Sequence, residues 1–163
     1  VHHGVAQFLY ATSTQDLQRT LRQFLRKLNE IREGPSLAEF EKHKVKVEFD
    51  AGVAEGMSFD YLDDETLGKC LNEISKSVLS MLDAFVVVRY YVPDGEKQKP
   101  LKFDYYLIRF TFGEREFEMI VHHDKGPRHL AVEELVELFF NRINRELKAL
   151  GLNALEKGLI RTV

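Results

Sequence analysis

The chain has 163 residues, 44% of them apolar, which is enough for one buried core, so we expect a single domain over residues 1–163. Its 23 basic and 26 acidic residues nearly cancel, which excludes net charge as a basis for binding nucleic acid or another polyion. The lone cysteine, Cys70, excludes an intramolecular disulfide and suits a reducing compartment.

Targeting signals are not evident in the sequence. The apolar stretches are too short to span a bilayer, and no charged-then-apolar leader precedes them. We therefore expect a soluble, cytoplasmic protein with no membrane partner. Residues 1–4 read Val-His-His-Gly and resemble the remnant of an expression tag, so we leave His2 and His3 out of the candidate sites.

The chain begins with a strand and a helix. Residues 5–11 form a short apolar run that predicts a strand, and the Thr and Ser residues after it offer a hydroxyl N-cap. Residues 15–32 predict a helix that Gly34-Pro35 ends. Apolar side chains recur through this helix at helical spacing, at Leu17, Leu21, Phe24, Leu25, Leu28 and Ile31.

A second strand and helix follow. Residues 44–50 alternate strictly between apolar and charged, which predicts a strand with one solvated face. Residues 51–62 have no periodicity and predict a loop. Asp63 and Asp64 then offer a cap to a helix. Its apolar stripe consists of Leu67, Cys70, Leu71, Ile74, Val78, Met81 and Leu82.

The second half of the chain predicts three adjacent strands over residues 84–92, 101–112 and 115–123, then a helix over residues 132–150. Residues 152–163 fit either a short helix or a closing strand. The element order is thus β-α-β-α-β-β-β-α. Adjacent strands with short turns pair antiparallel, so we expect an α+β domain in two layers, an antiparallel meander with helices mainly on one face.

The turn between the last two strands sets their expected register. Gly113 stands where a two-residue type II′ hairpin requires glycine, and this turn places Phe110 opposite Phe117. The same register places Asp104 opposite His123 on the core face. The connection over residues 93–100 is long and polar, so we expect it to form a wide, solvated loop.

A candidate site lies at the open end of this hairpin. Asp104, His123, Asp124 and His129 are residue types that bind Zn, Mn or Fe or that transfer protons near neutral pH. Adjacent residues of a strand point to opposite faces, so His122 and His123 cannot share one metal while the strand stays regular. A polar strand end with an Asp104–His123 pair explains the same residues structurally.

The order helix, three strands, helix also occurs in the core of restriction-endonuclease-like nucleases. Those enzymes carry Glu-x-Lys or a close variant on the third strand, where this chain has Glu116-Phe117-Glu118-Met119-Ile120 with no lysine two positions after either glutamate. Only the element order is shared, and no residue takes a role from that family.

The sheet face opposite the core carries a second apolar patch. We expect the first helix to cover this patch; if it does not, the patch is a surface for a partner. The patch consists of Phe85, Val87, Tyr91, Phe103, Tyr105 and Leu107. On the first helix, Arg19, Arg22 and Arg26 form a basic stripe that could bind an anion such as RNA or DNA, or simply be solvated.

Three functions remain open from the sequence. The leading expectation is a non-enzymatic binding or assembly module that uses the second apolar patch to bind itself or another protein. The alternatives are a metal-dependent hydrolase or nuclease at the Asp/His cluster, and a nucleic-acid-binding domain using the arginine stripe. No motif assigns a cofactor.

Overall fold

All strands of the described chain belong to one antiparallel sheet. The computed structural model describes residues 2–30, 46–55, 58–61, 63–76, 78–94, 97–100, 103–128 and 130–162. Its elements are β1 (His2–Leu9), α1 (Thr14–Leu28), β2 (Lys46–Glu55), β3 (Ser58–Tyr61), α3 (Asp64–Lys76), β4 (Met81–Asp94), β5 (Lys97–Pro100), β6 (Asp104–Phe112), β7 (Glu116–Lys125), α4 (Val132–Ala149) and β8 (Glu156–Thr162).

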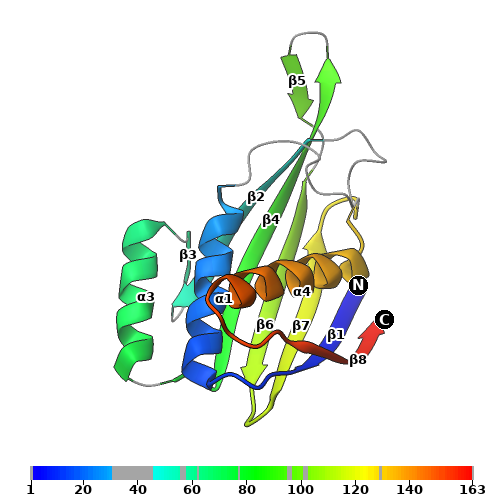
Figure 1. Cartoon of the computed structure of the whole chain (residues 1–163). Coiled ribbons are helices and arrows are strands. Elements are labelled where there is room, and N and C mark those ends of the chain that lie inside the picture. The colour runs from blue at the N-terminus through cyan, green and yellow to red at the C-terminus, as the bar shows by residue number, and fades with distance from the viewer. Residues whose placement is uncertain are drawn as a thin grey trace.

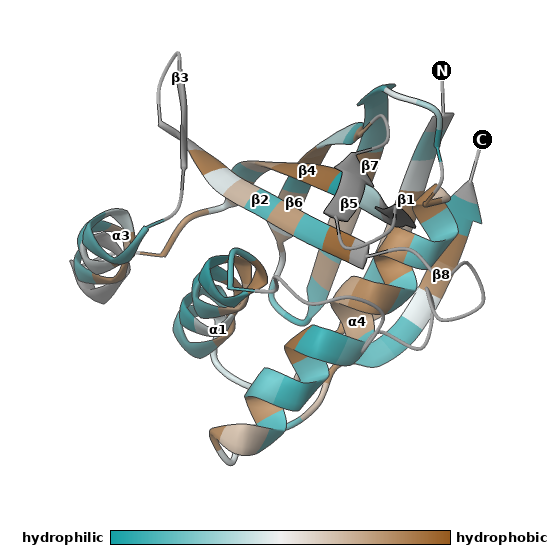
Figure 2. Ribbon diagram, turned by 90° about the horizontal axis from the view of Figure 1, so that it is seen from above, coloured by the Kyte–Doolittle hydropathy of each residue, from teal (hydrophilic) through white to brown (hydrophobic). Residues whose placement is uncertain are grey.

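The strands follow the order β3-β2-β4-β6-β7-β1-β8, and β5 pairs with one end of β4. Helices α1 and α4 lie across one face of this sheet, and α3 lies beside α1 (Figure 1). Seen from above, the three helices are on the same side of the sheet (Figure 2). The expected α+β class, the adjacent β4, β6 and β7 strands and the one-sided placement of the helices are confirmed.

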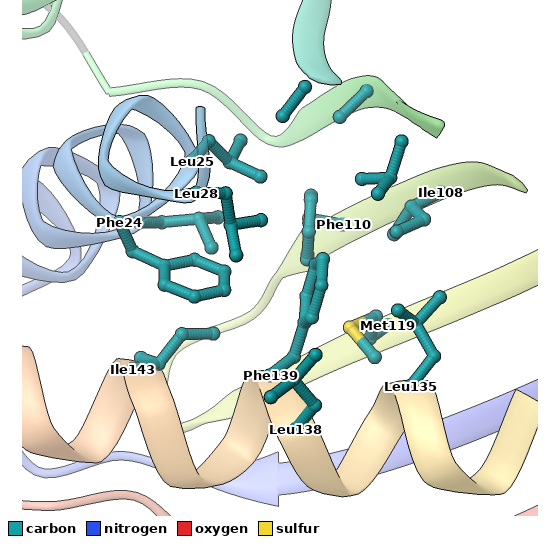
Figure 3. Close-up of a cluster of buried hydrophobic side chains, with 14 of the residues drawn as sticks. Phe24, Leu25, Leu28, Ile108, Phe110, Met119, Leu135, Leu138, Phe139 and Ile143 are labelled. Atoms are coloured by element: carbon teal, nitrogen blue, oxygen red, sulfur yellow. The ribbon is translucent and has the colours of Figure 1, made fainter. Parts of the chain in front are cut away.

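The core lies between the sheet and α1 and α4, because each contributes one apolar face. Along β6 and β7 every second side chain is buried, as the alternation in the sequence predicts. Phe24 of α1 meets Phe139 of α4 edge to face, with ring centroids 4.9 Å apart. Figure 3 shows these rings beside Phe110 and Met119 from the sheet.

Helix α1 begins and ends at identifiable caps. The Ser13 side chain accepts a hydrogen bond from the backbone N–H of Asp16 at 3.1 Å, which confirms the expected hydroxyl cap. The helix ends at Leu28, earlier than expected, with Asn29 as C-cap. The expected stop at Gly34-Pro35 lies outside the described residues.

Three amide side chains on helices or at their ends hold the backbone of other segments, each bonding both the N–H and the C=O of one residue. Gln18 holds Leu79 at 2.6 and 3.0 Å, and Asn29 holds Ala51 at 2.6 and 3.1 Å. Asn144 binds Leu155 in the same way, at 2.6 and 3.3 Å. An amide offers a donor and an acceptor at the spacing of a strand edge, so it can replace a missing strand partner.

The predicted register of the β6–β7 hairpin is wrong by two residues. Phe112 pairs with Phe117, and the intervening loop closes with a hydrogen bond of 2.8 Å from Gly113 N to Glu116 O. This loop is longer than the predicted two-residue turn, and Tyr10 stabilises it. The N–H of Tyr10 donates to Arg115 O at 3.0 Å, and its hydroxyl donates to Gly113 O. A shift of two keeps every side chain on its predicted face and changes only its partner.

Two predicted loops contain strands. Within residues 51–62, β2 continues to Glu55 and β3 pairs with it, so that Gly52 faces Tyr61. Within residues 93–100, β5 pairs with β4 from Pro100 to Lys97. Glycine and proline weaken strand propensity, but pairing with a neighbouring strand outweighs propensity, and proline is tolerated at the edge of a sheet.

The remaining boundaries follow from pairing partners. The second predicted helix corresponds to α3, which ends at Lys76 in the structure. Met81 and Leu82, expected in its apolar stripe, belong to β4. The ambiguous tail is a strand, β8, which pairs with β1. Cys70 is buried in α3, as its apolar surroundings predicted. No helix in the described ranges is long and apolar enough to cross a membrane.

Candidate functional site

Asp104 is the centre of a buried polar network beneath the helices. Its side chain is fully buried at the start of β6. One oxygen accepts a hydrogen bond from the Tyr90 hydroxyl at 2.6 Å. The other lies 2.8 Å from His123 Nε2 and accepts from the backbone N–H of Arg128 at 2.6 Å. Three partners around one carboxyl satisfy a group that would be costly to bury alone.

The local fold brings these groups together. Tyr90, Asp104 and His123 come from three adjacent strands and share the core face. The β6–β7 register shifts by one residue beside Asp104, between Tyr105 and Tyr106. His123 lies directly opposite Tyr106 at the last regular pair before this irregularity, and its imidazole reaches Asp104 along a diagonal.

Gly126 is the residue that lets the chain return over Asp104. Its φ is +116°, a backbone conformation that residues other than glycine rarely adopt. A Cβ at this position would lie 2.5 Å from Asp104 Oδ1 and 2.8 Å from Asp104 Cα. The nearby Arg128 also has a left-handed φ, 58°, and its N–H donates to the carboxyl.

Burial raises the pKa of both buried tyrosines of this network. For Tyr90 the loss of solvent is the largest cause, and Tyr106 and the Asp104 carboxyl raise the pKa of the phenol further. For Tyr106 burial again comes first and the charge of Asp104 second. The Tyr106 hydroxyl donates to Leu130 O. Both phenols therefore remain hydrogen-bond donors, which suits a supporting role and gives a substrate little access.

The four predicted ligands do not all meet. The side chains of Asp104 and His123 do, but the expected direct pairing of these two residues is wrong, because Tyr106 is the residue opposite His123. Asp124 follows His123 on the strand and points to the other face, where its side chain is 45% exposed and lies 3.9 Å from His122 Nε2. His129 lies outside the described residues. In the part of the chain that the structure describes, no group of three or more His, Cys, Asp or Glu is arranged to hold a metal.

His3 is a candidate that the sequence interpretation left out. Residues His2 and His3 belong to β1, where His3 pairs directly with His122 of β7. The two imidazoles stack with centroids 4.6 Å apart, and their Nδ1 atoms are 3.0 Å apart. Burial alternates from Gly4 to Phe8 in the structure, but the residues Gly4-Val5-Ala6-Gln7-Phe8 do not alternate between apolar and polar, so the sequence carries no signal that the strand begins this early.

The second apolar patch lies on the open face of the sheet, which we define as the face opposite the helices. Phe103 and Leu107 are 41% and 38% exposed, whereas Val87 is 8% exposed. Phe85, Tyr91 and Tyr105 are half-buried. The expectation that the first helix covers this patch is wrong: α1 packs its apolar side chains against the other face, because the larger apolar surface lies there.

The predicted arginine stripe is not a continuous surface. Arg22 is only 3% exposed, and its Nη1 donates to Cys70 O of α3 at 3.0 Å. Arg26 binds Asp64 at 2.9 Å and Glu30 at 3.5 Å. Arg19 is partly exposed. The stripe is divided because α3 packs beside α1, a contact that the helical periodicity of α1 alone does not reveal.

A cavity of about 620 Å³ lies where β1 ends and β8 begins. Its lining residues are Leu9, Tyr10, Ala11, Arg115, Asn153, Ala154, Leu155 and Glu156, of which Arg115 and Glu156 are charged. The two charges are opposite and both side chains belong to exposed residues. This lining favours no particular ligand chemistry.

Comparison with known proteins supplies no relative. No protein-family model matches the chain, and neither a curated protein nor a solved structure matches it.

Proposed function

We propose that this domain is a protein-binding or assembly module whose working surface is the open face of the sheet, and that the partner is a second copy of the chain. The observation that carries the proposal is the position of the helices. All three described helices pack on one face, so aromatic and aliphatic side chains of β4 and β6 remain partly exposed on the other.

The centre of this face is a compact apolar area. Phe85 and Leu107 face each other in the β4–β6 ladder, and Val87 faces Tyr105 in the next row. The Phe103 ring packs edge to face on Tyr105, with centroids 4.9 Å apart. Aromatic and large aliphatic side chains surrounded by polar groups are the usual composition of an interface core.

Ion pairs border the apolar area on two sides. At one end Arg109 binds Asp83 through two nitrogens, at 2.8 and 2.9 Å. At the other end Arg89 binds Asp50 at 2.6 Å. These pairs form a polar rim that remains satisfied when the centre is covered.

The outward row of β4 favours a second copy as the partner. Along it Asp83, Phe85, Val87 and Arg89 follow one another, so an acidic and a basic side chain, each paired within the sheet, lie on either side of the apolar residues. A two-fold axis that crosses the strand between Phe85 and Val87 would bring Asp83 of one copy over Arg89 of the other. Isologous contacts require this kind of self-complementary surface.

The test is the mass of the protein in solution. We expect sedimentation equilibrium to show a concentration-dependent dimer for the wild type and a monomer for Leu107→Glu, because the introduced carboxylate would be buried without a partner. Leu159→Glu is the matched control: Leu159 is 53% exposed on β8, outside the patch, so its variant should dimerise as the wild type does.

Circular dichroism establishes that both variants are folded. A wild type that stays monomeric at every concentration would overturn the proposal of self-association. A Leu107→Glu variant that dimerises as the wild type does would show that the interface lies elsewhere than on the open face.

A further inference from the structure

The stacked pair His3 and His122 is a set of two nitrogen ligands at one edge of the open face. The residues are direct cross-strand partners on β1 and β7, so the sheet itself fixes the separation of their backbones. His3 is exposed and the His122 side chain is 31% exposed. Both rings are therefore accessible to a small ion from solvent.

We propose that His3 and His122 form a binding site for a divalent transition-metal ion that accepts a square arrangement of ligands, namely Cu²⁺ or Ni²⁺. The proposal does not depend on self-association. A hydrogen bond between two imidazole nitrogens uses one N–H and one lone pair. When the metal binds, the donating Nδ1 gives up its proton and Nε2 of the same ring takes one up from solvent, so both imidazoles stay neutral and both Nδ1 atoms offer the metal a lone pair.

The distance between the nitrogens selects the kind of metal. Two nitrogens 3.0 Å apart, each about 2.1 Å from one ion, subtend an angle of about 90° at that ion. Neighbouring ligands in a square arrangement make this angle, whereas a tetrahedral zinc site needs nitrogens about 3.4 Å apart. Imidazole affinity also increases from Ni²⁺ to Cu²⁺ and falls again for Zn²⁺.

Asp124 is an acidic side chain near His122, beyond hydrogen-bond distance. Its carboxylate lies 3.9 Å from Nε2, on the side of the ring away from Nδ1. A carboxylate near Nε2 favours the proton there, which leaves Nδ1 with the lone pair that a metal needs. Leu107 is the cross-strand neighbour of His122 on the other side, so the pair borders the apolar patch.

The test measures metal binding by protein that carries no polyhistidine tag and whose terminal amino group is blocked. Isothermal titration with CuSO₄, NiCl₂ and ZnCl₂ should show one site, with Cu²⁺ bound more tightly than Zn²⁺. We expect affinity for Cu²⁺ to fall at least tenfold in both His3→Ala and His122→Ala. The matched control, His2→Ala, removes an imidazole at the adjacent position and should bind as the wild type does.

Electron paramagnetic resonance of the Cu²⁺ complex gives an independent measurement, because coupling to two imidazole nitrogens should disappear in His122→Ala. Full affinity in His122→Ala would overturn the proposal, since it would place the metal on the N-terminal residues alone. An equal loss in His2→Ala and His3→Ala would also overturn it. The two proposals fail separately. A protein that dimerises but binds no metal contradicts only the metal site, and a protein that binds metal but stays monomeric contradicts only self-association.

Discussion

His123 and Asp104 are joined inside the core although they are not opposite each other in the sheet. Nε2 of His123 lies 2.8 Å from Oδ1 of Asp104, while the residue directly opposite His123 is Tyr106. The contact is possible because the ladder is irregular beside Asp104 and the chain returns over the carboxyl at Gly126. Three strands and the following loop thus converge on one carboxyl.

Removing this carboxyl should destabilise the fold strongly. In Asp104→Ala the Tyr90 hydroxyl and the Arg128 N–H lose their acceptor while they stay buried or partly buried. We expect the free energy of unfolding to fall by about 3–5 kcal/mol. Urea denaturation measures this free energy. Asp124→Ala, at an exposed position of β7, should change it by less than about 0.5 kcal/mol. Equal effects would contradict the central role of Asp104.

The buried tyrosines predict a loss of stability at high pH. Burial raises the pKa of Tyr90 and Tyr106, so the native state keeps two protons that the unfolded chain releases above about pH 10. Their contribution is complete below that pH and falls above it, by about 1.4 kcal/mol per pH unit for each tyrosine. Tyr106→Phe should make this decline shallower.

Urea denaturation from about pH 8 to about pH 11.5 measures the slope, and the stability of each protein at the lowest pH is its own reference. An identical slope for Tyr106→Phe and the wild type would show that Tyr106 ionises in the native state as it does in the unfolded chain.

Two glycine-to-alanine changes should have opposite signs. In Gly126→Ala the added Cβ would lie within 2.8 Å of Asp104 Cα at a φ of +116°, so we expect a loss of about 2–4 kcal/mol. Gly68 lies in α3, and an added Cβ meets no atom within 4 Å. Gly68→Ala should therefore gain about 0.5–1 kcal/mol. Thermal unfolding compares the two, and a neutral Gly126→Ala would contradict the close approach.

The Asn29 amide should contribute more to the free energy of unfolding than an exposed amide of the same type. Asn29→Ala removes both hydrogen bonds to the backbone of Ala51, and we expect a loss of about 2–4 kcal/mol. Hydrogen exchange should show the Ala51 N–H losing protection in this variant. Asn153→Ala, at an exposed residue, is the control and should change stability by less than about 0.5 kcal/mol. Unchanged protection of Ala51 would refute the role of the amide.

Side-chain alternation predicted most of the sheet because each strand needs one apolar face. The face of every residue from Asp104 to Phe112 follows from the sequence, and so does the position of Asp104 and His123 on the core face, whereas their predicted direct pairing is wrong. The hairpin register does not follow, since the loop at Gly113 is bound by Tyr10, which is 103 positions away in the sequence. A local turn rule has no access to that contact.

The candidate sites were less predictable for the same reason. Periodicity placed Arg22 opposite the apolar stripe of α1, but it cannot show that α3 packs there. The pairing of His3 with His122 joins opposite ends of the sequence and became visible only in the sheet order. Sequence patterns specify the face of a residue, whereas sites depend on which elements are neighbours.

The position of β1 has a consequence for the time at which the sheet can form. This first strand lies between β7 and β8, so both of its neighbours come from the last third of the chain. Gln7 and Glu118, which bond across β1 and β7, are 111 positions apart. Contacts this distant in sequence slow folding. During synthesis, Ala6 and Phe8 therefore stay unpaired until the ribosome has made Met119 and Phe117, their partners on β7.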